Sequence, residues 1–157
     1  MIKTSYGILL YKQKNGKFYV LLAHPGGPFW ESKDLWTIPK GEPDSSDDND
    51  VFATAKREFS EETGLRPPIK NTKFIDLGEL PQSNMKINHI FAVEGDPDLN
   101  RFTSNTFDME WPPQSGIMQT FVEIDRIAWF DADSAKNKLF PKQQGFITRL
   151  EHALKDH

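Results

Sequence analysis

REFSEETG, residues Arg57 to Gly64, contains three glutamates within eight residues. Glu58, Glu61 and Glu62 are spaced i, i+3 and i+4, so in a helix their carboxylates share one face. Like charges at this spacing destabilise a helix by roughly 0.2–0.5 kcal/mol per pair. A hard divalent cation with oxygen ligands would relieve the repulsion, whereas a solvated surface helix would tolerate it. The charge pattern alone leaves both interpretations open.

The residues around this stretch predict a helix over residues 51–63. Asn49 or Asp50 can cap its start, and the alanines, lysine and arginine that follow favour helix. Gly64 is a natural terminator, because glycine adopts the left-handed backbone that ends many helices. The three glutamates therefore fall in the last two turns of the predicted helix.

The composition indicates one soluble domain over residues 1–157. Hydrophobic residues make up 37% and aromatic residues 12%, enough for a core. The chain has no cysteine, which excludes disulfides and thiol nucleophiles. A net charge of −4 argues against binding duplex nucleic acid, and no segment has the length of a membrane span. A cytoplasmic location is expected.

The rest of the chain alternates strand and helix patterns. YGILLY and FYVLLA flank Asn15-Gly16, a pair typical of a tight hairpin turn. KFIDLGEL, KINHIFAVE and MQTFVEIDRIAWF are expected to be strands, and SAKNKL and GFITRLEHALKDH terminal helices. Residues 95–116 are polar and rich in proline, and we expect a long loop there that is either functional or mobile. This arrangement favours a mixed α/β sandwich.

The full stretch Arg57–Leu65, REFSEETGL, resembles the core signature of the Nudix hydrolase family. That signature has Arg-Glu, an apolar residue, any residue, Glu-Glu, any residue, Gly and an apolar residue. At average amino-acid usage its charged and glycine positions would match by chance at roughly one in a million sites. LWTIPKGE upstream, with Gly41 at the glycine that opens the signature, and EIDRIAWFDADSA downstream also resemble the family.

The resemblance implies an α/β fold, the Nudix-type α/β/α sandwich with a mixed central sheet. It also implies a pyrophosphohydrolase that cleaves a diphosphate linkage in a nucleoside diphosphate joined to another moiety. Mg²⁺, or Mn²⁺ in its place, would be the cofactor. By position, the metal ligands would be Glu58, Glu61, Glu62 and the main-chain carbonyl of Gly41. Arg57 would orient a glutamate, and Glu58 or Glu61 would take part in catalysis.

Some family members use a base outside the motif, and two glutamates of this chain are candidates. Glu123, in the late strand, is favoured as the catalytic base, and Glu110, in the long loop, is close behind; Glu94 is weaker. Lys40 and Glu110 are further expected to contact substrate, as is Trp111, whose ring could stack on a base.

The sequence departs from the family in the loop before the helix. The spacing from Gly41 to Arg57 is longer than usual by two residues, and Asn49 stands where relatives carry a glutamate that braces the arginine. Asp48 or Asp50 is expected to replace that glutamate.

The substrate class stays open among dinucleoside polyphosphates, nucleoside triphosphates and ADP-ribose-like compounds. LWTIPKGE resembles members that cleave dinucleoside polyphosphates, whereas Pro81 lies near the position of a proline in members that cleave ADP-ribose. The alternative is a Nudix-fold nucleotide-sensing or interaction module without catalysis, although such proteins typically lose motif glutamates. Isomerase chemistry on an isoprenoid diphosphate would be expected to need a cysteine. The oligomeric state cannot be read from the sequence.

Overall fold

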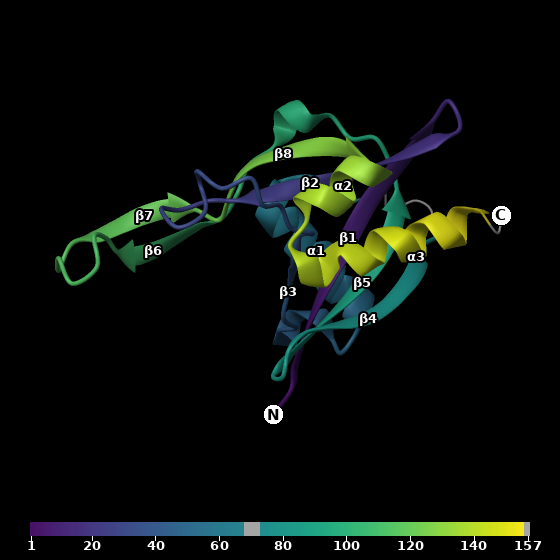
Figure 1. The fold of residues 1–157 in the computed structure, drawn as a ribbon. Helices are drawn as coiled ribbons and strands as arrows, with labels where there is room; N and C mark the ends of the chain where they lie inside the picture. The colour runs from purple at the N-terminus through teal and green to yellow at the C-terminus, as the bar shows by residue number, and fades with distance from the viewer. Residues whose placement is uncertain (68–72, 156–157) are drawn as a thin grey trace.

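A computed structural model describes residues 1–67 and 73–155 of the chain (Figure 1). Its main sheet is mixed, with strand order β4-β5-β1-β2-β8 and the short β3 paired to β1. β1 runs parallel to β5 and antiparallel to β2 and β3. The strands are β1 (Lys3–Lys14), β2 (Lys17–Pro25), β3 (Lys40–Gly41), β4 (Ile75–Ser83), β5 (Lys86–Glu94) and β8 (Ile124–Asp131).

Helices cover both faces of this sheet, which confirms the predicted α/β/α sandwich. α1 (Val51–Thr63) lies on one face, and α2 (Ala132–Lys138) and α3 (Gln144–Lys155) lie on the other (Figure 1). Short 3-10 turns complete the chain: η1 (Ser45–Asp47), η2 (Leu99–Arg101) and η3 (Pro141–Gln143). The helix predicted over residues 51–63 has those bounds in the structure.

The central strand β1 shows why its apolar run is continuous rather than alternating. Ile8 and Leu10 pack in the core under α1, whereas Leu9 and Tyr11 pack in the core under α3. Successive side chains of a strand point to opposite faces, so a strand covered on both faces is apolar at every position. β1 therefore separates two hydrophobic layers and fixes where α1 sits.

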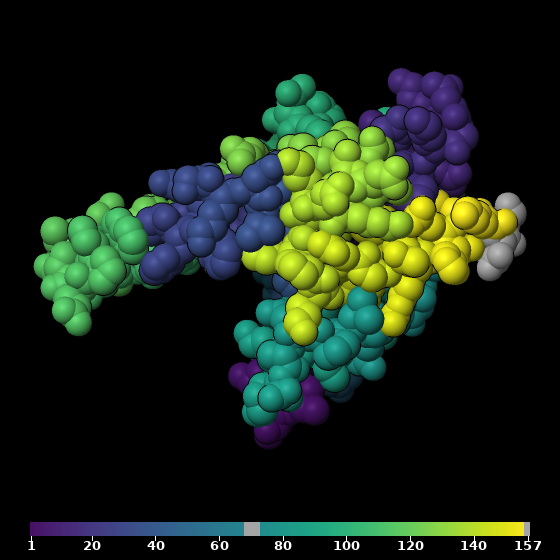
Figure 2. Space-filling model, viewed as in Figure 1, coloured from purple at the N-terminus to yellow at the C-terminus, as the bar shows by residue number. Residues whose placement is uncertain are grey.

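The segment expected to be a long loop contains a strand. β6 (Thr106–Glu110) pairs antiparallel with β7 (Met118–Val122), and the strand region expected over residues 118–130 divides at Glu123 into β7 and β8. The β6–β7 ribbon projects from the body of the molecule (Figures 1 and 2). The residues of β6 alternate between polar and apolar over only five positions. This strand pattern is short, and the surrounding prolines and glycines made the segment look like a loop in the sequence.

No helix within the described residues is long and apolar enough to cross a membrane.

Candidate active site

The caps of α1 set the register that gathers the glutamates on one face. Asp50 begins the helix by accepting hydrogen bonds from the main-chain N–H groups of Phe52 and Ala53. Gly64 ends it with φ at 71°, and its N–H donates to the carbonyl of Ser60. A side chain at Gly64 would also collide with Thr103, since a Cβ there would lie 2.1 Å from the threonine hydroxyl oxygen.

Arg57 is the centre of an ion network. Its Nη1 lies 3.0 Å from carboxylate oxygens of both Glu58 and Glu61. Its Nε and Nη2 donate to the two oxygens of Asp47, at 3.0 and 3.1 Å, and Nη2 also donates to the carbonyl of Glu42. A planar guanidinium holds several acceptors in a fixed geometry, so this arginine positions two motif glutamates at once.

Asp47 is the acid that braces Arg57, and the expectation of Asp48 or Asp50 is wrong. Asp50 is occupied as the helix cap, and Asp48 has a left-handed backbone at the end of η1. Asp47 is only 5% exposed and also accepts from the hydroxyl of Thr54. The guanidinium beside it holds the pKa of the Asp47 carboxyl well below its ordinary range.

The conformation of the acid-rich loop, residues 42–50, explains why Asp47 was not predicted as the partner of Arg57. With two extra residues, the loop forms the η1 turn, and that turn moves the supporting carboxylate further from the arginine along the chain. Asp44 caps the turn, and its own N–H donates to Asp47. The signal available in the sequence was Asp44 followed three residues later by Asp47, an acidic version of a capping box.

Glu62 lies apart from the arginine and against β3. Its carboxylate accepts a 2.8 Å hydrogen bond from the main-chain N–H of Lys40. Burial raises the pKa of the Glu62 carboxyl to about 8, although the charge and the N–H of Lys40 oppose that rise. Burial also lowers the pKa of the Lys40 ammonium, whose Nζ lies 3.5 Å from the Thr37 hydroxyl. The structure thus brings Lys40, predicted to contact substrate, next to a motif glutamate.

The backbone of Gly41 packs against the carboxylate of Glu58. A Cβ at position 41 would lie 2.0 Å from the carboxyl carbon of Glu58, so only glycine lets the β3 backbone approach this carboxylate. The pairing of Gly41 with Tyr6 of β1 holds that backbone in place. The predicted proximity of Gly41 to the motif glutamates is therefore present in the structure.

The oxygen atoms at this site are of the kind that a hard cation prefers, since three carboxylates lie here with main-chain carbonyls nearby. The carboxylates are nonetheless turned onto protein partners, Arg57 for Glu58 and Glu61 and the Lys40 N–H for Glu62. Among the described residues, accordingly, no group of three or more acids or histidines converges in a geometry that could hold a metal. Metal binding would need these side chains to turn from those partners.

Glu123 reaches the motif through a series of main-chain hydrogen bonds. The Asn105 N–H donates to the carbonyl of Glu61, and the Glu123 N–H donates to the carbonyl of Asn105. The Gly26 N–H then donates to the carbonyl of Glu123. The charge of Glu123 contributes to raising the pKa of Glu62, as expected of a nearby carboxylate. The structure therefore brings Glu123 to the motif.

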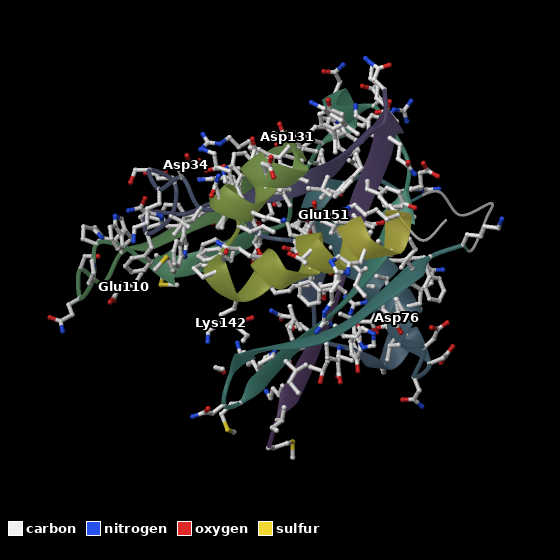
Figure 3. The ribbon with its side chains drawn as sticks, turned by 45° about the vertical axis from the view of Figure 1, so that its right-hand side comes forward. Asp34, Asp76, Glu110, Asp131, Lys142 and Glu151 are labelled. Carbon is white, nitrogen blue, oxygen red and sulfur yellow. The ribbon has the colours of Figure 1, made fainter. Side chains whose placement is uncertain are left out.

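Glu110 lies elsewhere, at the end of β6 on the projecting ribbon (Figure 3). Trp111 follows it, and its N–H donates to the carbonyl of Ile117 just before β7. The Glu110 carboxylate accepts from the main-chain N–H groups of Gln114 and Gly116, so it closes the turn of the ribbon. Trp111 packs edge-on against Phe29, with ring centroids 5.2 Å apart. Neither residue is brought together with the motif glutamates.

Comparison with known proteins identifies the family and the fold. The profile of the NUDIX domain matches residues 1–150. An Ap4A hydrolase of C. elegans, in a binary complex, has a TM-score of 0.65 at 14% identity, covering 99% of this chain and 100% of that one.

Two further solved structures share the fold. The NUDIX domain of Shewanella oneidensis NrtR, complexed with ADP ribose, has a TM-score of 0.61 at 14% identity, covering 98% of this chain and 89% of that one. A mutT/nudix family protein of Listeria innocua has a TM-score of 0.62 at 16% identity, covering 98% and 94%. At such identities the structures establish a shared fold, and the domain match establishes the family. The chain belongs to the Nudix family.

Proposed function

We propose that this protein is a Mg²⁺-dependent Nudix pyrophosphohydrolase that cleaves a diphosphate linkage in a nucleoside diphosphate joined to another moiety. The observation that carries the proposal is the network around Arg57, which holds Glu58 and Glu61 at 3.0 Å from one nitrogen. A charged surface helix without a function would have little need for a buried acid such as Asp47 behind its arginine.

The motif carboxylates are the groups that would hold the metal. The proposed ligands are Glu58, Glu61, Glu62 and the carbonyl of Gly41, with Mn²⁺ as an alternative ion. When bound, such an ion polarises a phosphoryl oxygen and promotes ionisation of water. The close approach of Gly41 to Glu58 supports this set, because it brings the main chain of β3 against the Glu58 carboxylate.

The chain's own residues supply orientation and proton transfer. Arg57 fixes the direction of Glu58 and Glu61. Glu123 is the proposed base, because an exposed carboxylate near Glu62 can accept a proton from the attacking water. Lys40 is proposed to bind a substrate phosphate, since its ammonium, which is largely removed from water, would gain more from a phosphate than from water.

The substrate side of the site is proposed to lie along the loop of residues 26–33, here called the aromatic loop. Phe29 is 52% exposed, Trp30 is 37% exposed, and both precede β3 on the chain. Exposed aromatic rings are suited to stacking on a nucleobase. Trp111 packs on Phe29 and extends this surface onto the ribbon, which supports its proposed role in substrate binding.

The decisive experiment is a hydrolysis screen with Mg²⁺ over dinucleoside polyphosphates, nucleoside triphosphates, nucleotide sugars, ADP-ribose and capped RNA. Glu62→Gln removes a proposed metal ligand and is expected to abolish most turnover. Glu79→Gln, an exposed acid on β4, is the matched control and should retain it. Absence of turnover for every substrate, or equal turnover in Glu62→Gln, would contradict the proposed function.

A non-catalytic nucleotide-sensing module is the second candidate. It is favoured by the engagement of all three motif glutamates with Arg57 or the Lys40 N–H. Calorimetry separates the two functions. Binding of an intact diphosphate compound that persists in Glu62→Gln, without hydrolysis in either protein, would support sensing.

A further inference from the structure

His24 is a fully buried histidine at the end of β2, where the chain leaves the sheet for the aromatic loop, residues 26–33. Its Nε2 lies 2.5 Å from the main-chain carbonyl of Lys33, at the far end of that loop. Its Nδ1 lies 2.8 Å from the carboxylate of Asp125 on β8. One ring therefore joins the two ends of the loop to the neighbouring strand.

A bulge directs Asp125 towards this ring. In the pairing of β2 with β8, His24 faces Arg126 and Pro25 faces Ile124, so Asp125 is the unpaired extra residue. Such bulges redirect a side chain and often lie next to functional sites. The Asp125 carboxylate is three-quarters buried, and Arg126 approaches the same oxygen at 4.0 Å.

Both contacts of the ring are with oxygen atoms of the carbonyl and carboxylate type. A carbonyl oxygen can only accept, so Nε2 must bear a hydrogen to bond Lys33. An ionised carboxylate can also only accept, so Nδ1 must bear a second hydrogen to bond Asp125. The ring can therefore bond both partners at once only with a hydrogen on each nitrogen. It lies edge-on against Trp36, with 5.1 Å between ring centroids.

The segments joined by this ring carry the proposed base and the aromatic surface. Glu123 lies two residues before Asp125 and shares a main-chain hydrogen bond with Gly26, the first residue of the aromatic loop. Gly26 and Gly27 are buried, and a Cβ at Gly27 would lie 2.9 Å from the ring of Phe107 on the ribbon. Movement of the loop would therefore be transmitted to Glu123.

We propose that His24 is a positioning residue, which bonds Lys33 and Asp125 simultaneously as an imidazolium and thereby holds Glu123 beside the motif glutamates. This role rests on the proposed function, because it matters for activity only if Glu123 serves the hydrolysis. The bonding of the ring can be tested without any turnover.

The first test is a two-bond ¹H–¹⁵N correlation spectrum of the histidine rings in the intact protein at pH 7. The chain has four histidines, and the His24 signals are assigned by their loss in His24→Gln. We expect hydrogens on both ring nitrogens of His24. A ring with only one hydrogen would overturn the imidazolium.

The second test follows amide hydrogen exchange at Gly26 and Glu123. His24→Gln and Asp125→Ala should accelerate exchange at both amides by about tenfold or more, because local opening becomes easier. Asp125→Asn should preserve slow exchange, since an amide can donate to a neutral ring that keeps its hydrogen on Nε2. His89→Gln is the matched control: His89 pairs with Asp76 at 2.7 Å but does not join the loop.

The third test is kinetic, on a substrate found by the screen. A displaced base lowers kcat, so His24→Gln and Asp125→Ala should lose about 10- to 100-fold in kcat with KM changed much less. Asp125→Asn should recover most of that loss. Unchanged kcat and exchange in both damaging variants, or equal damage from Asp125→Asn, would overturn the proposal. A wild type that hydrolyses nothing refutes the proposed function, while the spectrum and the exchange rates still decide how the ring is bonded.

Discussion

α1 and the β6–β7 ribbon are opposites in how they are held. The motif face of α1 is fixed by charge, because Arg57 is bonded to three carboxylates, those of Glu58, Glu61 and the buried Asp47. Within the part of the chain that the structure describes, the strands of the ribbon pair only with each other, and they carry exposed apolar side chains, including Met118 at 63% exposure. A two-stranded ribbon is marginally stable on its own.

The contrast separates two requirements of the proposed enzyme. The chemistry of a diphosphate bond needs firmly held carboxylates, and the ion network keeps Glu58 and Glu61 together on one face of α1, from which they would turn to a metal. Substrate choice needs exposed surface, and the ribbon and aromatic loop provide that. Changes to the network should therefore alter the rate, and changes to the ribbon should alter apparent affinity.

The largest effect is expected from Arg57→Ala. It releases Glu58 and Glu61 and leaves Asp47 buried without its cation, so kcat/KM should fall by about 100- to 1000-fold. Arg57→Lys keeps the charge but cannot hold several acceptors in one plane, so its kcat/KM should stay below about a tenth of the wild-type value. Steady-state kinetics measures both. Near-normal activity in Arg57→Ala would remove the network from the mechanism.

Asp47→Asn tests whether the brace acts by charge. The amide keeps the size of the side chain but weakens both bonds to the guanidinium, so kcat should fall by about tenfold with KM little changed. Asp48→Asn is the matched control in the same loop and should behave as wild type. Equal losses in the two variants would assign the role to the loop as a whole.

The raised pKa of Glu62 predicts that the stability of the metal-free protein depends on pH. Its pKa is raised from 4.5 to about 8 on folding, so the stabilisation present below the unfolded pKa is lost as pH rises towards the folded one. Glu62→Gln removes the cost of burying this charge. Calorimetry should show the variant melting about 3–6 °C above wild type at pH 9, with little difference at pH 4.5. An equal difference at both pH values would contradict this origin.

The smallest effect is expected from Trp111→Ala on the ribbon. Loss of stacking should raise KM about fivefold with kcat unchanged, at the low end of what an aromatic contributes to binding a base. Trp111→Phe keeps an aromatic ring and should restore most of the affinity. A fall in kcat would mean that the ribbon also positions the chemistry, and the contrast with α1 would fail.

The sequence predicted best what depends on local spacing. The caps and periodicity of α1, the Asn15-Gly16 hairpin and the terminal helices follow from neighbouring residues, and each is present in the structure. Residues 156–157, which the expected last helix included, lie outside the described residues. The motif also predicted that Gly41 lies beside the motif glutamates, and its backbone lies against Glu58. Its role as a metal ligand stays a prediction.

What the sequence missed depends on contacts between distant residues or on loop conformation. Asp47 was overlooked because the η1 turn, not the count of residues, decides which acid meets Arg57. Glu110 was placed near the chemistry because nothing in its surroundings revealed that its carboxylate would close the ribbon's own turn. The contact between His24 and Asp125 spans 101 residues and depends on a bulge.

The series of bonds that links Glu61, Asn105, Glu123 and Gly26 has a consequence for how this protein can change over generations. Every donor and acceptor in it belongs to the backbone, so substitutions at these positions leave the links intact unless they introduce proline or a steric clash. The segments proposed to lie around the substrate can therefore exchange exposed side chains while their anchorage to α1 is kept. Variant libraries directed at residues 103–107 and 28–31 should accordingly yield folded proteins with new substrate preferences more often than libraries directed at residues 42–50.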